Sequence, residues 1–137
     1  MLELKNISKT FFPGTVHEKT ALDNLSLTLH EGDFVTVIGG NGAGKSTMLN
    51  AVAGVWPVDM GKIIIDGKDI SEYTAKELTT YRREDVGFVF QFYNLVSNLT
   101  ARENVELASE IVPNAKDATQ TLVEVGLGDR LDNFPSQ

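Results

Sequence analysis

A glycine-rich segment that runs directly into a lysine and a serine restricts the fold of this chain more than any other feature of its sequence. Residues 39–47 read GGNGAGKST and match the pattern G-x-x-x-x-G-K-[ST]. The apolar run 34–38 precedes this segment, and residues 46–55 carry apolar side chains at helical spacing. A buried strand, a glycine loop and a helix in this order predict a loop that holds phosphate groups.

The residues of this segment have the chemistry that an anion site needs. Glycines let the backbone fold closely around an anion, and the N–H groups of the loop and of the following helix N-terminus then point toward it. Lys45 adds a full positive charge for the β- and γ-phosphates, and Ser46 offers a hydroxyl to Mg²⁺. The alternative, a glycine-rich turn with an accidental Lys-Ser pair, is much rarer in a chain of this size. The candidate phosphate-binding residues are Gly39, Gly40, Asn41, Gly42, Ala43, Gly44, Lys45, Ser46 and Thr47.

Composition limits the remaining classes of function. The chain has 137 residues, no cysteine, and 12 Lys and Arg against 19 Asp and Glu, for a net charge of −7. This length suits one domain, and the lack of cysteine excludes disulfides, cysteine-bound zinc and a thiol nucleophile. The negative charge argues against nucleic acid as a partner. The apolar runs are too short for a membrane helix and the N-terminus does not resemble a signal peptide, so we expect a cytoplasmic protein.

Hydrophobic spacing predicts that the chain begins with strands and ends with helices. Leucines at every second position favour strands at 2–4 and 25–29, and the apolar run 34–38 predicts a strand that is buried on both faces. Thr74 and Thr100 each begin a Thr-x-x-Glu sequence, which is typical of helix N-termini. The other expected elements are strands at 63–65 and 86–90, and helices at 46–55, 74–83, 100–112 and 115–125.

Three stretches of the sequence together resemble the nucleotide-binding domain of ATP-binding cassette (ABC) transporters. They are residues 31–49 (EGDFVTVIGGNGAGKSTML), 61–67 (GKIIIDG) and 86–105 (VGFVFQFYNLVSNLTARENV). The resemblance implies an α/β fold of the P-loop NTPase type, with an N-terminal antiparallel β portion, a strand–helix core at the phosphate loop and the start of a helical subdomain. It implies that residues 1–90 form the β portion and core, and that residues 91–137 form the rest.

The same resemblance implies ATP and Mg²⁺ as ligands and adds candidate residues. Gln91 stands where the family has a glutamine that contacts Mg²⁺ and the attacking water and links the nucleotide site to the membrane partner. Lys45 and Gln91 are therefore the catalytic candidates, and Ser46 and Gln91 are the candidate Mg²⁺ ligands. A glutamine amide oxygen is chemically suited to a hard cation.

An aromatic residue that stacks on adenine is also implied. Phe11 stands at that position, although the family more often has tyrosine there, and the neighbouring Phe12 competes for the role. A phenyl ring can stack on a base as well as a phenol ring can. Val16, in the same loop region, is a further candidate for lining the adenine site.

The family resemblance also implies protein partners. Residues 94–97 and the helix after them would receive the transmembrane subunits of a transporter, with Tyr93 and Leu95 either contacting that partner or packing internally. In the family, the full-length domains form homodimers, and the assembled protein is peripheral at the inner face of the cell membrane.

Several motifs that the family carries beyond this region do not occur among these residues. They are the Leu-Ser-Gly-Gly-Gln signature, a strand ending in Asp-Glu, and a switch histidine, because His17 and His30 both precede the phosphate loop. We therefore expect this chain to bind ATP as part of the ATPase component of a transporter, to hydrolyse it poorly by itself, and to be marginally stable or self-associating. The alternative is a non-catalytic nucleotide-binding or assembly module. A small kinase is disfavoured by the match around Gln91.

The two parts of the sequence resemble different branches of the family. Residues 84–95 resemble the branch of lipoprotein release, cell division and macrolide export, whereas residues 1–67 resemble another branch of bacterial importer-type ATPases. A chimera joined within residues 67–80 is one hypothesis that accounts for this difference.

Overall fold

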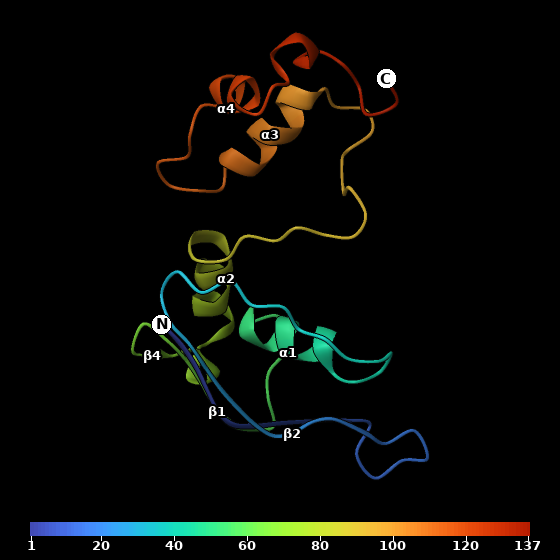
Figure 1. The fold of residues 1–137 in the computed structure, drawn as a ribbon, viewed down its shortest axis with the longest axis vertical. Coiled ribbons are helices and arrows are strands. Elements are labelled where there is room, and N and C mark those ends of the chain that lie inside the picture. Colours follow the sequence, from blue (N-terminus) through green and yellow to red (C-terminus); the bar gives the residue numbers. More distant parts are fainter. The chain divides into compact units, whose positions relative to one another are not determined.

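The computed structural model describes residues 1–137. It contains a four-stranded antiparallel sheet. The strand order is β2-β1-β3-β4. Figure 1 labels β1, β2 and β4 of this sheet. The strands are β1 (Leu2–Phe11), β2 (Lys19–Leu29), β3 (Met60–Ile65) and the short β4 (Lys68–Asp69). The chain divides into two units, Met1–Arg82 and Arg83–Gln137, and the sheet belongs entirely to the first unit.

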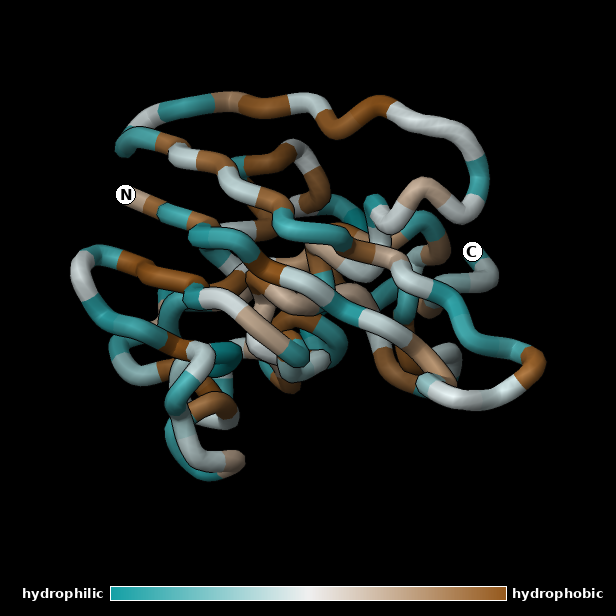
Figure 2. Tube along the Cα trace, turned by 90° about the horizontal axis from the view of Figure 1, so that it is seen from below, coloured by the Kyte–Doolittle hydropathy of each residue, from teal (hydrophilic) through white to brown (hydrophobic).

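Alternating side chains place the core of the first unit on one face of this sheet. Leu4, Ile7, Leu22 and Ile63 are all buried. Leu25, Leu27 and Leu29 are less exposed than the residues between them, as the leucine spacing predicts for a sheet that is covered on one side. In Figure 2, hydrophobic and hydrophilic segments alternate along the strands. The antiparallel β portion expected at the N-terminus is therefore confirmed.

Helix α1 (Lys45–Val52) and most of helix α2 (Ala75–Glu84) complete the first unit. Helix α1 follows the glycine-rich loop, and α2 begins after the 3-10 turn η1 (Ile70–Glu72). The Tyr81 hydroxyl donates to the carbonyl oxygen of Val52 over 2.9 Å, and Arg82 donates to the carbonyl oxygen of Gly54. These bonds fix α2 against the end of α1. Gly54 has a φ of 66°, which suits the turn that ends a helix.

The second unit contains short helices that begin at side-chain caps. Helix α3 (Ala101–Ser109) has the expected capping box, in which Thr100 and Glu103 bond to each other's backbone N–H groups. Helix α4 (Ala118–Glu124) is capped by Asp117, and the 3-10 turn η2 (Gly128–Arg130) follows. Because the capping box involves neighbours in sequence, local pattern was sufficient to predict the start of α3. The helix expected at 115–125 forms over Ala118–Glu124, and its Asp117 cap was not predicted.

Two expected strands do not form. Residues 34–38 and 86–90 form neither helix nor strand. Phe34 is 97% exposed and Val89 is 101% exposed. The prediction of a buried strand at 34–38 and of a strand at 86–90 was wrong because an apolar run shows what a segment can bury, whereas a strand also needs a neighbour for its backbone hydrogen bonds.

Candidate functional site

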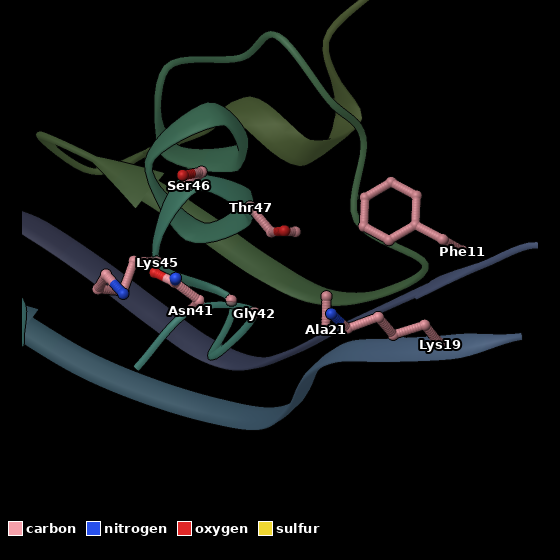
Figure 3. A pocket seen from close by; sticks show the side chains of 9 residues that line it. Phe11, Lys19, Ala21, Asn41, Gly42, Lys45, Ser46 and Thr47 are labelled. Atoms are coloured by element: carbon pink, nitrogen blue, oxygen red, sulfur yellow. The ribbon is translucent and has the colours of Figure 1, made fainter. Parts of the chain in front are cut away.

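A pocket of about 320 Å³ lies where the β1–β2 hairpin meets the glycine-rich loop and the start of α1 (Figure 3). It brings together an aromatic ring, two lysines and two hydroxyl groups, and none of its lining residues carries a carboxylate. This composition suits an anion with an attached flat ring. The lining residues are Phe11, Lys19, Ala21, Asn41, Gly42, Gly44, Lys45, Ser46 and Thr47.

The N-terminus of α1 faces this pocket without a side-chain cap. Its N-cap residue is Gly44, which makes no side-chain hydrogen bond, whereas α3 and α4 are capped by Thr100 and Asp117. The N–H groups in the first turn of a helix have no partner within the helix. Those of α1 are therefore available to an anion, and the helix dipole adds positive potential at the same place.

Gly44 also lets the loop lie directly on strand β2. Its φ is 90°, and a Cβ placed on it would come within 2.2 Å of the carbonyl oxygen of Ala21. No other residue type fits this backbone without a clash. The glycine thus sets the position of the loop relative to the hairpin that carries Phe11.

The side chain of Lys45 bends back along the loop. Its Nζ donates to the carbonyl oxygens of Gly39 and Gly40, at 2.5 Å and 2.8 Å. Ala43 N–H also donates to Gly40, over 3.2 Å, and closes the loop on itself. Gly39, Gly40 and Ala43 therefore shape the loop, although they do not line the pocket.

Phe11 reaches the pocket from the end of β1. Its ring meets the edge of Trp56 at a centroid distance of 5.5 Å and an interplanar angle of 79°. Lys9 Nζ lies 5.8 Å from the centroid of the same ring. Phe12, the competing candidate, is exposed and does not line the pocket. The geometry therefore favours Phe11 over Phe12 as the ring beside the loop.

Asp59 holds the backbone next to Phe11. Its carboxylate accepts from the Thr10 N–H over 2.7 Å and from Lys9 Nζ over 2.9 Å. The backbone hydrogen bond from Thr10, and then the bond from Lys9, lower the pKa of Asp59 below its ordinary value. The carboxylate thus stays charged at neutral pH and anchors the end of β1.

Two candidates from the sequence lie outside this pocket. Val16 is 96% exposed and does not line the pocket, because the turn bonds from Thr15 to Phe12 and from Glu18 to Thr15 fold its loop on itself. The structure therefore does not bring Val16 into the site. Gln91 belongs to the second unit and is exposed, in a segment that forms neither helix nor strand.

Sequence reasoning missed two residues that line the pocket, Lys19 and Ala21. Both lie at the start of β2, where no motif marks them. Lys19 is the Cα partner of Phe11 in the antiparallel ladder. The signal that could have found Lys19 is therefore the pairing of the two strands, because cross-strand partners share a face of the sheet. Ala21 has no partner in the ladder and lies at a register shift, so no sequence signal marks it.

The second unit has an apolar hollow of its own, of about 570 Å³. Beside it, the Asn104 amide group accepts from the Val96 N–H over 2.8 Å and donates to the carbonyl oxygens of Val96, Leu99 and Thr100. This side chain fixes the segment that leads into α3. The hollow is lined by Leu95, Ala101, Asn104, Val105, Ala108, Leu122, Leu127, Arg130, Asn133, Phe134, Pro135 and Gln137.

Comparison with protein families and curated proteins gives consistent matches. The sequence model of one family, described as ABC transporter, matches residues 22–137. The chain is 39% identical to the macrolide export ATP-binding/permease protein MacB of Brucella abortus, covering 100% of this chain and 22% of that protein. It is 38% identical to an uncharacterized ABC transporter ATP-binding protein of Methanocaldococcus jannaschii, covering 100% of this chain and 63% of that protein.

Solved structures match over the whole chain as well. The post-hydrolysis dimer of the ATP-binding cassette MJ0796 bound to ADP and Pi superposes with a TM-score of 0.84 at 36% identity. That match covers 100% of this chain and 62% of the cassette. The likeness confirms the α/β fold class of the P-loop NTPase type. No helix of the structure has the length and apolar character to span a membrane.

Proposed function

Because this chain belongs to the ABC transporter family of ATP-binding proteins, we propose that it binds ATP with Mg²⁺ as part of the ATPase component of a transporter. The observation that supports this most is the pocket in which Phe11, Lys19 and Lys45 converge at the uncapped N-terminus of α1. Its volume of about 320 Å³ lies within the range of small-ligand sites.

Each part of the pocket suits one part of the nucleotide. The N–H groups of the loop and of the first turn of α1 would hold phosphate oxygens. Lys45 would exchange its bonds to Gly39 and Gly40 for the β- and γ-phosphates, since an ammonium binds an anionic oxygen more strongly than a neutral carbonyl. Phe11 would stack on the adenine ring.

Mg²⁺ fits this site through Ser46, whose side chain lines the pocket. No group of three or more His, Cys, Asp or Glu side chains gathers as a metal site in the chain. Mg²⁺ accepts one protein oxygen together with phosphate oxygens and waters. When bound, it would neutralise charge on the phosphates. By family resemblance, Gln91 is proposed as a second ligand and as a contact to the attacking water.

We expect phosphate release by this chain alone to stay near the uncatalysed rate. Activating water requires a group that can take its proton. The pocket is lined by no carboxylate and no histidine. The residues of the first unit therefore bind and orient the nucleotide. ATP turnover well above background would instead show a competent enzyme. Phosphate release at the background rate together with tight ATP binding also fits the alternative of a nucleotide-binding assembly module.

The apolar hollow of the second unit suits a protein partner. Leu95 lies in its lining and Tyr93 is 92% exposed, and large exposed apolar surfaces mark interaction sites. We assign this surface to a segment of a transmembrane subunit, which would place the assembled protein at the inner face of the membrane. The similar cassette MJ0796 is described as dimeric, and we propose the same pairing for this protein.

Calorimetric titration of ATP with Mg²⁺ tests the binding proposal. Lys45→Ala should weaken binding at least about tenfold, since a charge-assisted hydrogen bond is lost. Lys76→Ala is the matched control, because Lys76 is exposed on α2 and does not line the pocket. Emission from Trp56, the only tryptophan, gives a second readout because its ring contacts Phe11. Equal ATP affinity in the wild type and Lys45→Ala would refute the proposal.

A further inference from the structure

We propose that Lys19 is a nucleotide-binding residue that contacts the α-phosphate, a role that rests on the proposed binding of ATP in the same pocket. Lys19 has no place in the phosphate-loop motif, which begins at Gly39. It lies at the start of β2 and lines the pocket together with Phe11 and the loop.

The ladder between β1 and β2 sets the starting point of this side chain. Lys19 and Phe11 are Cα partners, and partners in an antiparallel ladder place their side chains on the same face of the sheet. The lysine therefore leaves the hairpin beside the ring that is assigned to the base. Figure 3 shows its side chain running from that side of the pocket toward the loop.

The amine of Lys19 ends at the phosphate loop. A Cβ placed on Gly42 would lie 2.9 Å from Lys19 Nζ. The ammonium thus occupies the interval between the Phe11 ring and the loop. A nucleotide that stacks its base on Phe11 and lays its β- and γ-phosphates in the loop has its ribose and α-phosphate in this interval. Of these two, only the α-phosphate is charged, and a lysine ammonium is a compact cation that suits a phosphate oxygen.

Lys19 and Lys45 have different surroundings, which separates their roles. Lys45 Nζ is bonded to the loop carbonyl oxygens of Gly39 and Gly40. Lys19 forms no ion pair with any carboxylate of the chain. Its charge is therefore not paired with a carboxylate of the protein and is available to an anionic ligand. A Lys19 contact to the α-phosphate is made equally by ATP and ADP, whereas a contact to the γ-phosphate is made by ATP alone.

Titrations of ATP and of ADP with Lys19→Met test this assignment, because methionine keeps much of the length of the side chain without its charge. We expect both affinities to fall by a similar factor, about three- to tenfold. Lys19→Arg should restore most of the loss. Lys76→Met, which changes the same charge outside the pocket, should bind both nucleotides as the wild type does. Thermal melts of each variant report whether the chain remains folded.

Three outcomes would overturn the assignment, and they differ from a failure of the proposed function. Unchanged affinities in Lys19→Met would remove Lys19 from the site. If Lys19→Met loses affinity for ATP but keeps its affinity for ADP, Lys19 contacts the γ-phosphate instead. If Lys76→Met loses as much affinity as Lys19→Met, the loss comes from the change in net charge and not from a contact in the pocket. If the wild type itself does not bind ATP, the proposed function fails before Lys19 is tested.

Discussion

Phe11 and Lys19 are Cα partners at one end of the β1–β2 ladder, and both line the pocket beside the glycine-rich loop. An aromatic ring and a cation therefore extend from adjacent strands into one site. The hairpin thus contributes to the pocket as directly as the loop does, although only the loop carries a recognisable motif.

Replacing Phe11 should affect ligands that carry a base and spare those that do not. Phe11→Ala is expected to weaken ATP binding by roughly 1–3 kcal/mol, the usual contribution of base–aromatic stacking. Binding of inorganic tripolyphosphate should stay unchanged, and Phe11→Tyr should keep the affinity for ATP. Phe12→Ala is the control, since Phe12 lies outside the pocket. Equal losses for ATP and tripolyphosphate would place Phe11 in a structural role only.

Gly44 and Gly67 form a matched pair for testing the contact between the loop and β2. Both have positive φ, 90° and 81°, but only a Cβ on Gly44 meets the backbone of Ala21. Gly67→Ala should therefore cost only about 1 kcal/mol of unfolding free energy, the cost of a left-handed residue. Gly44→Ala should cost at least about 1 kcal/mol more, because the clash adds to that cost. Chemical denaturation measures both, and equal losses would show that the loop does not lie on β2.

The stability of the second unit should fall in acid because of Glu103. The backbone N–H of Thr100, and then the Thr100 hydroxyl, lower the pKa of Glu103 below its ordinary value. The unfolded chain then takes up this proton more readily, so the stabilisation is present at neutral pH and is lost as the pH falls through the lowered pKa. Helix melting followed by circular dichroism from pH 7 to about pH 3 should show this loss.

Two variants separate the contribution of this carboxylate. Glu103→Gln should reduce the pH dependence, because glutamine does not titrate. Thr100→Ala removes the hydroxyl but keeps the N–H group, which is the larger cause of the lowered pKa. It should therefore keep most of the pH dependence. A Glu103→Gln variant that melts with the same acid dependence as the wild type would contradict this account.

The exposed apolar segments 34–38 and 86–90 should make this chain self-associate. Backbone groups without a strand partner and apolar side chains together favour pairing between chains. Val89→Lys should reduce association measured by sedimentation velocity at two concentrations. Val16→Lys makes the same change at another fully exposed valine, 96% against 101% exposed, and should leave association unaltered. A wild-type chain that sediments as a monomer at both concentrations would disprove this expectation.

Local sequence was a good guide wherever the structure depends on neighbours in the chain. The capping box of Thr100 and Glu103 spans one turn, and it formed as expected. The helix after the phosphate loop also formed, since a glycine loop followed by helical spacing needs no distant partner. The strand expected at 34–38 did not form, because a strand depends on a second segment that sequence pattern alone does not supply.

The pairing of Phe11 with Lys19 depends on irregularities in the hairpin. Asn6 and Asn24 both have φ near 50° (51° and 52°), and the Asn6 amide donates to Asn24 over 2.9 Å. The register of the ladder shifts between Leu4 and Ile7, between Ile7 and Lys9, and again between Lys9 and Thr10. The first two shifts cancel, and the third sets Phe11 opposite Lys19. Counting every second residue from Leu2 therefore does not give the partner of Phe11, because each bulge moves the register.

Residue types at short spacing were sufficient to predict the glycine-rich loop, the family and the capping box of Thr100 and Glu103. The tertiary structure sets which side chains join that loop in one pocket. It brought Phe11 and Lys19 to the loop and kept Val16 away. The physical reason is that hairpin register and the close approach of Gly44 to Ala21 are set by contacts between segments far apart in the chain.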